Sequence, residues 1–260
     1  MSNSPLIYQR DGARALLTLH RPDRRNALSP ELVLALREGL DRARADAGVL
    51  VVVLTGSGDK AFCAGGDLGG GMMDGGVVPA HLARAGFADL FRAMRDLGKP
   101  IVARVNGDAL GGGLGLVAAC DLVVSRDDAR FGTPEIKLGL FPWIILASIL
   151  RVVPRKVALE LALTGDPISA DEARRVGLVN RVVPLAALDV EVDRLCASVE
   201  RHSPALLALG RDGISAMSEM TLDQALAYGN AMLTVNTLAE DAAEGVAAFL
   251  GKRAPEWKGR

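Results

Sequence analysis

Three consecutive glycines, Gly111 to Gly113, follow a short strand-like run and lead directly into an apolar helical stretch. Glycine lets another group approach the main chain closely, and the N–H groups at a helix start have no intrahelical partner and carry partial positive charge. A second glycine-rich turn, residues 61–68, follows the strand-like run 49–54. Two such N–H donors that converge on one carbonyl oxygen would stabilise an enolate-like anion. The two turns therefore predict a receptor for an oxyanion, built from the backbone.

Strand and helix signals alternate through the first half of the chain. Ser29 followed by Pro30 indicates a helix start, because serine caps a helix and proline suits its first position. The run 49–55 is continuously apolar, which is typical of a strand buried on both faces. We expect strands at 13–20, 49–55, 100–105 and 121–125, and helices at 29–45, 81–97 and from the glycines to 120. This βαβ alternation predicts an α/β core with right-handed crossovers.

The second half of the chain is predicted to be mainly short amphipathic helices. Ser169 with Glu172, and Thr221 with Gln224, have the spacing of a capping box. Further helices are expected at 185–199, 204–217, 222–238 and 241–250. We expect them to pack on the core or on a neighbouring subunit. The predicted division is an α/β core in residues 1–200 and a C-terminal helical region in residues 201–260.

Composition argues against several classes of partner and site. The net charge of the 260 residues is −1, so nothing indicates a nucleic-acid partner. The three cysteines lack metal-ligand spacing, so we expect no metal site, no disulfide framework and a reducing compartment. The apolar run 138–153 is broken by Pro142 and Arg151 and is too short to span a bilayer. Since the N-terminus lacks the pattern of a signal peptide, we expect a soluble cytoplasmic protein that does not enter a membrane.

Six blocks in register carry a resemblance to a known family. They are 19–28, the two glycine turns at 61–68 and 106–115, the block 131–142, the stretch 163–179 and the ending 249–260. From Ala15 to Arg260 the chain resembles the enoyl-CoA hydratase/isomerase (crotonase) family, with the blocks in the family's order. The resemblance implies a crotonase-type ββα spiral core with a C-terminal helical trimerisation region. It also implies acyl-CoA thioester substrates and assembly as a homotrimer or a dimer of trimers.

The resemblance assigns roles to particular residues. Gly66 and Gly112 match the positions whose backbone N–H groups form the family's oxyanion hole for the thioester carbonyl. Contacts with coenzyme A (CoA) are implied at its adenine end for Ala64, Asp67 and Leu68, and at a subunit contact for Phe249 and Lys252. Because CoA is part of the substrate, we expect no separate cofactor.

Hydratases of this family use two glutamates, of which the chain retains one. The first position holds Gly115, and the second holds Glu135. Adding water across a C2=C3 bond needs a base to activate the water and an acid to protonate C2, which two positioned groups do best. Moving a double bond from C3 to C2 needs only one base, which takes a proton from one carbon and returns it to another. The sequence therefore favours Δ3-Δ2 enoyl-CoA isomerisation over enoyl-CoA hydration, in fatty-acid or related acyl-CoA metabolism.

Several alternatives stay open. Glu135 also suits a helix start capped by Thr133, Asp108 is a substitute acid or an exposed turn residue, and Asp67 is also typical of a turn. The apolar residues at 140–145 line an acyl pocket or belong to the core. A non-catalytic acyl-CoA binding subunit of the same fold is the alternative to an enzyme. A serine hydrolase is disfavoured, because no serine lies in a supporting motif.

Overall fold

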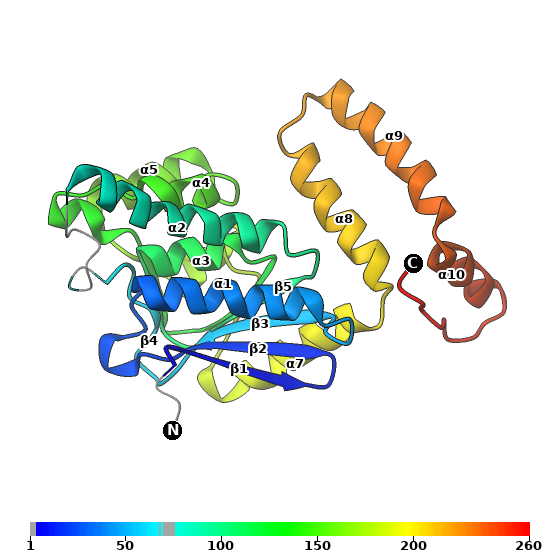
Figure 1. Cartoon of the computed structure of the whole chain (residues 1–260), viewed down its shortest axis with the longest axis horizontal. Helices are drawn as coiled ribbons and strands as arrows, with labels where there is room; N and C mark the ends of the chain where they lie inside the picture. The colour runs from blue at the N-terminus through cyan, green and yellow to red at the C-terminus, as the bar shows by residue number, and fades with distance from the viewer. Residues whose placement is uncertain (1–3, 68, 70–75) are drawn as a thin grey trace.

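Two β-sheets lie at the centre of the computed structural model, which describes residues 4–67, 69 and 76–260 (Figure 1). Within these residues, one sheet has six strands in the order β1-β2-β3-β5-β7-β10, and the other has four in the order β4-β6-β8-β9. The pairs β1/β2 and β8/β9 are antiparallel and the other pairs are parallel. The strands are β1 (Leu6–Asp11), β2 (Arg14–Leu19), β3 (Val51–Gly56), β4 (Ala61–Cys63), β5 (Ile101–Val105), β6 (Asp108–Leu110), β7 (Leu122–Arg126), β8 (Arg130–Gly132), β9 (Ile168–Ser169) and β10 (Arg181–Val183).

Helices connect and cover the sheets. They are η1 (Pro22–Arg24), α1 (Pro30–Ala45), α2 (Val77–Arg95), α3 (Gly112–Ala119), η2 (Pro134–Leu138), α4 (Trp143–Ile149), α5 (Arg155–Thr164), α6 (Ala170–Arg175), α7 (Leu185–Glu200), α8 (Pro204–Met217), α9 (Leu222–Leu238) and α10 (Glu240–Leu250). Ser29 caps α1 by accepting from the N–H of Leu32, and Thr221 with Gln224 forms a capping box, as predicted. Across the described segments, every helix is too short or too polar to cross a membrane.

Successive strand pairs contribute one strand to each sheet. β3 lies in the six-stranded sheet and β4 in the four-stranded sheet, and the pairs β5/β6 and β7/β8 repeat this arrangement. Helix α2 follows β4, α3 follows β6, and η2 with α4 follows β8. The repetition confirms the expected α/β core of ββα units. Because β4 and β6 are parallel neighbours, the connections that follow them leave the same edge of the sheet.

The central strand β3 separates two hydrophobic cores, and all six of its residues are buried. Val52 and Leu54 belong to the larger core, which includes buried residues of α1 and α2. Val51 and Val53 belong to the second core, with Leu188 of α7. Successive side chains of a strand point to opposite faces, so a strand between two helical layers must be apolar throughout. This explains the continuous apolar run in the sequence.

The sequence prediction did not include the short strands β4, β6, β8, β9 and β10 or the helices α4 and α5. Two further differences have a local cause. Strand β1 was not predicted, because only Leu6 of its six residues is buried and an edge strand with one partner carries a weak apolar pattern. Helix α2 begins at Val77 instead of His81. Its N-cap is Gly76, which offers no side chain for a capping hydrogen bond, so the start of this helix lacks a sequence signal.

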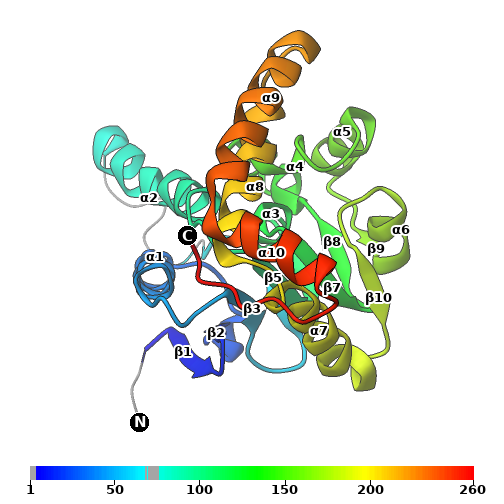
Figure 2. The same ribbon diagram turned by 90° about the vertical axis from the view of Figure 1, so that its right-hand side faces the viewer.

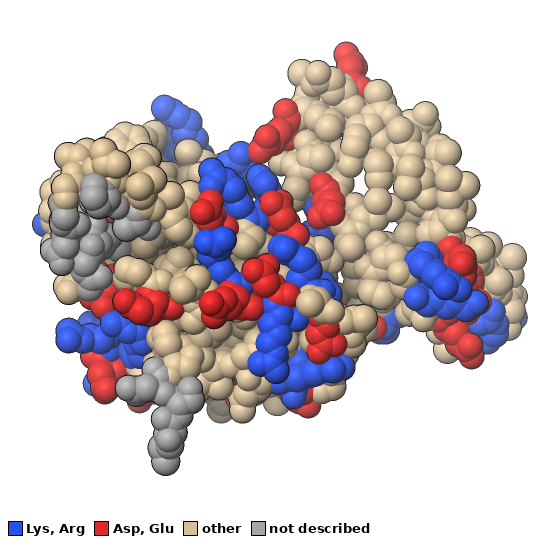
Figure 3. Space-filling model, viewed as in Figure 1, with Lys and Arg blue, Asp and Glu red and all other residues tan. Residues whose placement is uncertain are grey.

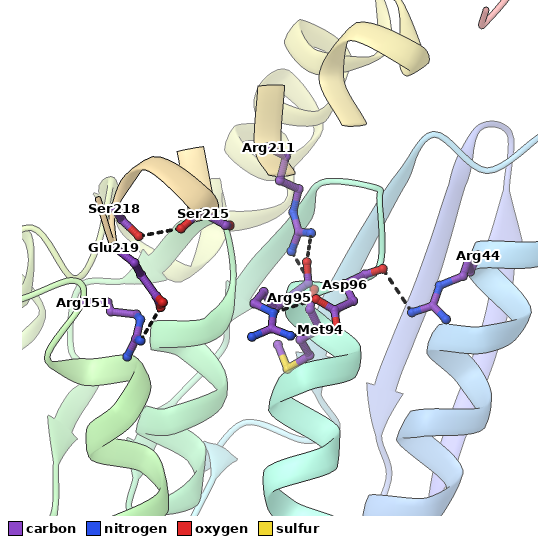
Figure 4. Close-up of polar contacts among 9 residues, drawn as sticks. All are labelled: Arg44, Met94, Arg95, Asp96, Arg151, Arg211, Ser215, Ser218 and Glu219. Atoms are coloured by element: carbon purple, nitrogen blue, oxygen red, sulfur yellow. Dashed lines mark hydrogen bonds and ion pairs between the residues drawn. The ribbon is translucent and has the colours of Figure 1, made fainter. Parts of the chain in front are cut away.

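The last helices project from the core as an arm, α8 to α10 (Figures 1 and 2). Arg211 on α8 connects the arm to the core, because its guanidinium pairs with Asp121 at 2.8 Å. The same guanidinium donates to the carbonyl oxygen of Met94 at 2.6 Å (Figure 4). An ion pair of 2.7 Å between Arg151 and Glu219 lies in the same region. No residue of α8 or α9, both of which are fully described, is buried. Polar contacts therefore connect α8 to the core, and the side chains of α8 and α9 stay at least partly exposed.

Asp241, near the start of α10, fixes the C-terminal segment. Its buried carboxylate accepts from the hydroxyl of Ser203 at 2.5 Å and from the backbone N–H groups of Lys258 at 2.6 Å and Gly259 at 2.9 Å.

Hydrogen bonds to a charged group contribute about 1.5–3 kcal/mol each, so Asp241→Ala is expected to lower the free energy of unfolding by at least about 3 kcal/mol. Urea titration measures this against Asp212→Ala, an exposed change expected to stay within about 0.5 kcal/mol of wild type. Equal stability of the two variants would contradict the expectation.

Candidate active site

The two glycine turns meet at the start of α3. Gly65 has a φ of +101° and Gly111 a φ of +51°, a region that residues with side chains rarely adopt. A β-carbon on Gly65 would lie 3.2 Å from the carbonyl oxygen of Leu110 and 3.4 Å from the backbone nitrogen of Gly112. The main chain after β4 therefore touches the main chain after β6 directly, without side chains between them.

The backbone N–H groups of Gly66 and Gly112 have no backbone partner among the described residues. Leu28 forms a parallel bridge with Gly66: the N–H of Leu28 donates to the Gly65 carbonyl at 2.8 Å, and its own carbonyl accepts from the N–H of Asp67 at 2.9 Å. In such a bridge the residue between the two bonded neighbours directs its own N–H away from the partner. Gly112 is the first residue of α3, so its N–H has no intrahelical acceptor. Both groups can donate to an anion.

Glu135 places its carboxylate beside these turns. It follows β8 in η2, and a β-carbon on Gly111 would lie 2.9 Å from its Oε1. Its Oε2 is buried and has no hydrogen-bond partner in the described structure. Burial raises the pKa of Glu135 above its ordinary value. A buried carboxylate with a raised pKa and a free oxygen can accept a proton and return it.

The sequence offered a second explanation for Glu135, as an acidic residue in the first turn of a helix that Thr133 caps. The structure does not contain a side-chain cap from Thr133. The Thr133 side chain makes no capping hydrogen bond to η2. Its hydroxyl oxygen is buried, without a partner within the described ranges. Helix capping by Thr133 therefore does not account for the position of the Glu135 carboxylate against Gly111.

The raised pKa of Glu135 has a consequence for stability. Because the folded protein disfavours the charged carboxylate, the stabilisation from protonated Glu135 is complete below the ordinary glutamate pKa, about 4.3, and is lost as pH rises through the raised folded pKa. Glu135→Gln carries no charge at any pH, so we expect it to have a higher Tm than wild type at neutral pH. The difference should shrink as pH falls towards 4. Thermal melts of both proteins across this range test it, and parallel Tm curves would contradict it.

A basic cavity of about 230 Å³ lies beside Ala64. Its lining includes Arg25, Lys60 and Arg130, together with the carboxylate of Asp108. Asp108 pairs with Arg130 at 2.6 Å. The three cations come from separate parts of the chain, so no spacing in the sequence indicated that they would share a cavity. The cavity carries a net positive charge next to a residue predicted to contact CoA.

Asp67, another predicted CoA contact, is held by a neighbouring arginine. Its carboxylate pairs with Arg21 at 2.7 Å, and this hydrogen bond lowers the pKa of Asp67. This ion pair agrees with the alternative that Asp67 has a structural role in the turn. A role in binding CoA stays a prediction for Asp67 and for Ala64. Leu68 lies outside the described residues.

Comparison with known proteins identifies the family. The family model described as enoyl-CoA hydratase/isomerase matches residues 10–260. The chain belongs to the enoyl-CoA hydratase/isomerase family. It is 36% identical over 258 residues to 2,3-dehydroadipyl-CoA hydratase of Escherichia coli, an alignment that covers 99% of this chain and 100% of the relative.

Solved structures of this family share the fold. A crystal structure of enoyl-CoA hydratase from Mycobacterium smegmatis matches with a TM-score of 0.93 and 38% identity, covering 97% of this chain and 98% of that one. Human enoyl Coenzyme A hydratase domain-containing protein 3 matches with a TM-score of 0.93 and 31% identity, covering 97% and 100%. The resemblance and the crotonase-type fold predicted from the sequence are therefore confirmed.

In this member of the family, apolar side chains lie against the position where the family's hydratases have their first glutamate. A β-carbon on Gly115 would lie 2.5 Å from Cγ2 of Ile145 and 3.0 Å from Cζ of Phe91. Asp108, the suggested substitute acid, is engaged elsewhere: it accepts from the Arg130 backbone N–H at 3.0 Å as well as from the Arg130 side chain. Of the apolar residues at 140–145, Ile145 is buried in the core.

Phe249 and Lys252 lie at the far end of the arm from the glycine turns. The side chain of Phe249 is exposed, as is Lys252 just beyond the end of α10. In Figure 1, α10 lies across the molecule from β4. The single chain therefore does not bring these two residues to Glu135. Their predicted contact with CoA at a subunit boundary stays a prediction.

Proposed function

We propose that the chain is an acyl-CoA enzyme that shifts a double bond from C3 to C2 of an enoyl-CoA thioester, with Glu135 as the only proton carrier. The observation that carries this proposal is the buried Glu135 carboxylate, whose Oε1 lies against Gly111 and whose Oε2 has no described partner. The N–H groups of Gly66 and Gly112, which have no described backbone partner, belong to the two turns beside it. One base and one oxyanion receptor are sufficient for this reaction.

The proposed reaction has two proton transfers. The Glu135 carboxylate takes a proton from C2 of the 3-enoyl thioester, and the electron pair moves onto the thioester oxygen. The N–H groups of Gly66 and Gly112 donate to this oxygen, so the dienolate is stabilised without a metal or a charged side chain. Glu135 then returns the proton to C4, and the double bond forms between C2 and C3. The raised pKa of Glu135 favours its protonated form in the intermediate.

Hydration is the second candidate, because relatives such as that of Escherichia coli are named hydratases. Hydration needs one group to activate water and another to protonate C2. Position 115 is a glycine, and the carboxylate of Asp108 is paired with Arg130. Backbone N–H groups donate hydrogen bonds but cannot accept a proton. We therefore expect hydration to be the slower of the two reactions.

The basic cavity beside Ala64 supports a CoA thioester as the substrate. The phosphates of CoA are anions, and Arg25, Lys60 and Arg130 supply cations close to the oxyanion receptor. We propose that the cavity receives the nucleotide part of CoA and that the acyl part extends towards Glu135. Because the number and spacing of the cysteines predict a reducing compartment, we propose that the enzyme acts in the cytoplasm.

We further propose that the arm assembles chains into a homotrimer or a dimer of trimers, in which Phe249 and Lys252 reach the CoA of a neighbour. The arm offers exposed apolar side chains at Ile214, Leu222, Leu226, Leu233, Leu238, Val246 and Leu250. Figure 3 shows its α8–α9 part as largely uncharged, in contrast to the core. Such a surface needs a partner.

Light scattering at micromolar concentration is expected to give the mass of three or six chains, and a monomer mass would contradict the proposal.

Mass spectrometry with a panel of 2-enoyl- and 3-enoyl-CoA thioesters tests the proposed activity. We expect conversion of 3-enoyl thioesters to 2-enoyl isomers, and slow hydration of crotonyl-CoA at most. Fast hydration of crotonyl-CoA with inert 3-enoyl thioesters would favour a hydratase. Binding of CoA thioesters without turnover of any of them would favour a non-catalytic acyl-CoA binding subunit.

A further inference from the structure

The space beside Gly115 is filled by two apolar side chains from different helices. A β-carbon at this position would lie 2.5 Å from Cγ2 and 2.8 Å from Cβ of Ile145 on α4, and 3.0 Å from Cζ of Phe91 on α2. Real β-carbons essentially never approach another heavy atom closer than 3.0 Å. Because the Ile145 contact includes its Cβ, it cannot be relieved by rotating a flexible side chain. No side chain fits at position 115 while Ile145 stays in place.

This filled space lies about one helical turn from the residue that the Glu135 carboxylate approaches. Gly111, the N-cap of α3, is four positions before Gly115, and the N–H of Gly115 donates to the Gly111 carbonyl at 3.1 Å. One turn of helix rises about 5.4 Å along its axis. The Gly111 position faces the Glu135 carboxylate, and the Gly115 position faces Ile145. Ile145 and Phe91 therefore form an apolar wall about one helical turn from the place of the Glu135 carboxylate.

Ile145 is held in the core, and Phe91 borders a cavity. Ile145 is 6% exposed and belongs to the main core. Phe91, behind it, also lines a cavity of about 370 Å³ at the other end of α3. That cavity is bordered by polar side chains, among them Arg151 and Arg211, whose contacts Figure 4 shows. Polar groups in a cavity hold water, so water is expected on the cavity side of Phe91.

We propose that Ile145, backed by Phe91, determines the reaction specificity of this enzyme by excluding water and a second carboxylate from the face of the substrate next to Glu135. This inference rests on the proposed isomerase activity. With the wall in place, the dienolate has only Glu135 as a proton donor and the 2-enoyl product meets no positioned water. The wall has a consequence for variants at position 115. Gly115→Glu alone should not create a hydratase, because the new side chain has no room.

The test compares the two reactions in single variants. Ile145→Ala removes three carbon atoms beside Gly115, and a water molecule needs about 30 Å³ in the liquid. A water next to a positioned base gains about 10²-fold or more in reactivity, so we expect the ratio of hydration rate to isomerisation rate to rise at least about tenfold. Ile149→Ala is the matched control, since Ile149 is a buried isoleucine of the same helix and is not among the closest neighbours of Gly115. Ile149→Ala should lose about as much stability as Ile145→Ala and keep the wild-type ratio of hydration rate to isomerisation rate.

A double variant tests the second part of the proposal. Gly115→Glu combined with Ile145→Ala is expected to hydrate crotonyl-CoA about 10²-fold faster than Ile145→Ala alone, whereas Gly115→Glu alone should lose Tm and gain no hydration. An unchanged ratio in Ile145→Ala, or an equal change in Ile149→Ala, would overturn the proposal even if the double variant does not fold. If wild type fails to isomerise any 3-enoyl thioester, the proposed function itself fails, so the two failures are distinguishable.

Discussion

Glu135→Gln is expected to lower kcat for isomerisation by about 10²- to 10⁴-fold, the usual loss when a positioned general base is removed. Glutamine keeps the size and polarity of the side chain but cannot take the C2 proton. The free N–H groups of Gly66 and Gly112 remain, so the thioester should still bind. We therefore expect a loss in kcat with CoA affinity nearly unchanged, measured by steady-state kinetics and by calorimetry with a substrate analogue.

Glu160→Gln serves as the control for this change. Glu160 is an exposed glutamate on α5, so its replacement should leave kcat at the wild-type value. If Glu135→Gln also keeps full activity, Glu135 has no part in the mechanism. A variant that loses CoA binding together with activity would instead assign Glu135 a role in holding the substrate.

Gly113→Ala is expected to have the second largest effect. A β-carbon on Gly113 would lie 2.2 Å from the carbonyl oxygen of Cys63 and 2.8 Å from its Cβ. Since these atoms belong to the buried end of β4, α3 must move away from β4. The N–H of Gly112 then leaves its place beside the turn at Gly65. Misplacing one oxyanion donor costs about 10²- to 10³-fold in kcat, and we also expect a lower Tm.

Gly210→Ala is the matched control for this prediction. Gly210 is also a helical glycine, on α8, and a β-carbon there would meet nothing within 4 Å. Helix propensity alone favours alanine over glycine by about 1 kcal/mol at both positions. Gly210→Ala should therefore keep full activity and gain slightly in stability. If Gly113→Ala behaves in the same way, the close approach of the two turns is not needed for activity.

The parts of this fold that follow from local patterns were predictable from the sequence. The continuous apolar run of β3, the serine cap of α1 and the capping box of α9 each produced the expected element. Strand β1 has one buried residue and α2 has a glycine at its N-cap. Neither gives a periodic or capping signal, so the first was missed and the second was placed too late.

For the candidate site, the sequence indicated which residues to consider but not how they are arranged. Glycine spacing suggested two turns with free N–H groups, whereas the contact between Gly65 and Gly112 depends on the parallel pairing of β4 and β6. The wall beside Gly115 depends on α4 packing against α3, which no local pattern encodes. Ile145 was therefore left undecided between a pocket residue and a core residue. Its contact with Gly115 becomes visible only in three dimensions.

Isomerisation of a 3-enoyl-CoA in deuterated water tests the central claim most directly, because it follows the proton that Glu135 is proposed to carry. Mass spectrometry and NMR of the 2-enoyl product report the deuterium content at C4. If Glu135 takes the proton from C2 and returns it within its buried site, part of the product keeps the original hydrogen and deuterium incorporation is partial. Complete incorporation of solvent deuterium at C4, or a 3-hydroxyacyl thioester as the main product, would contradict the claim that Glu135 alone carries the proton within its buried site.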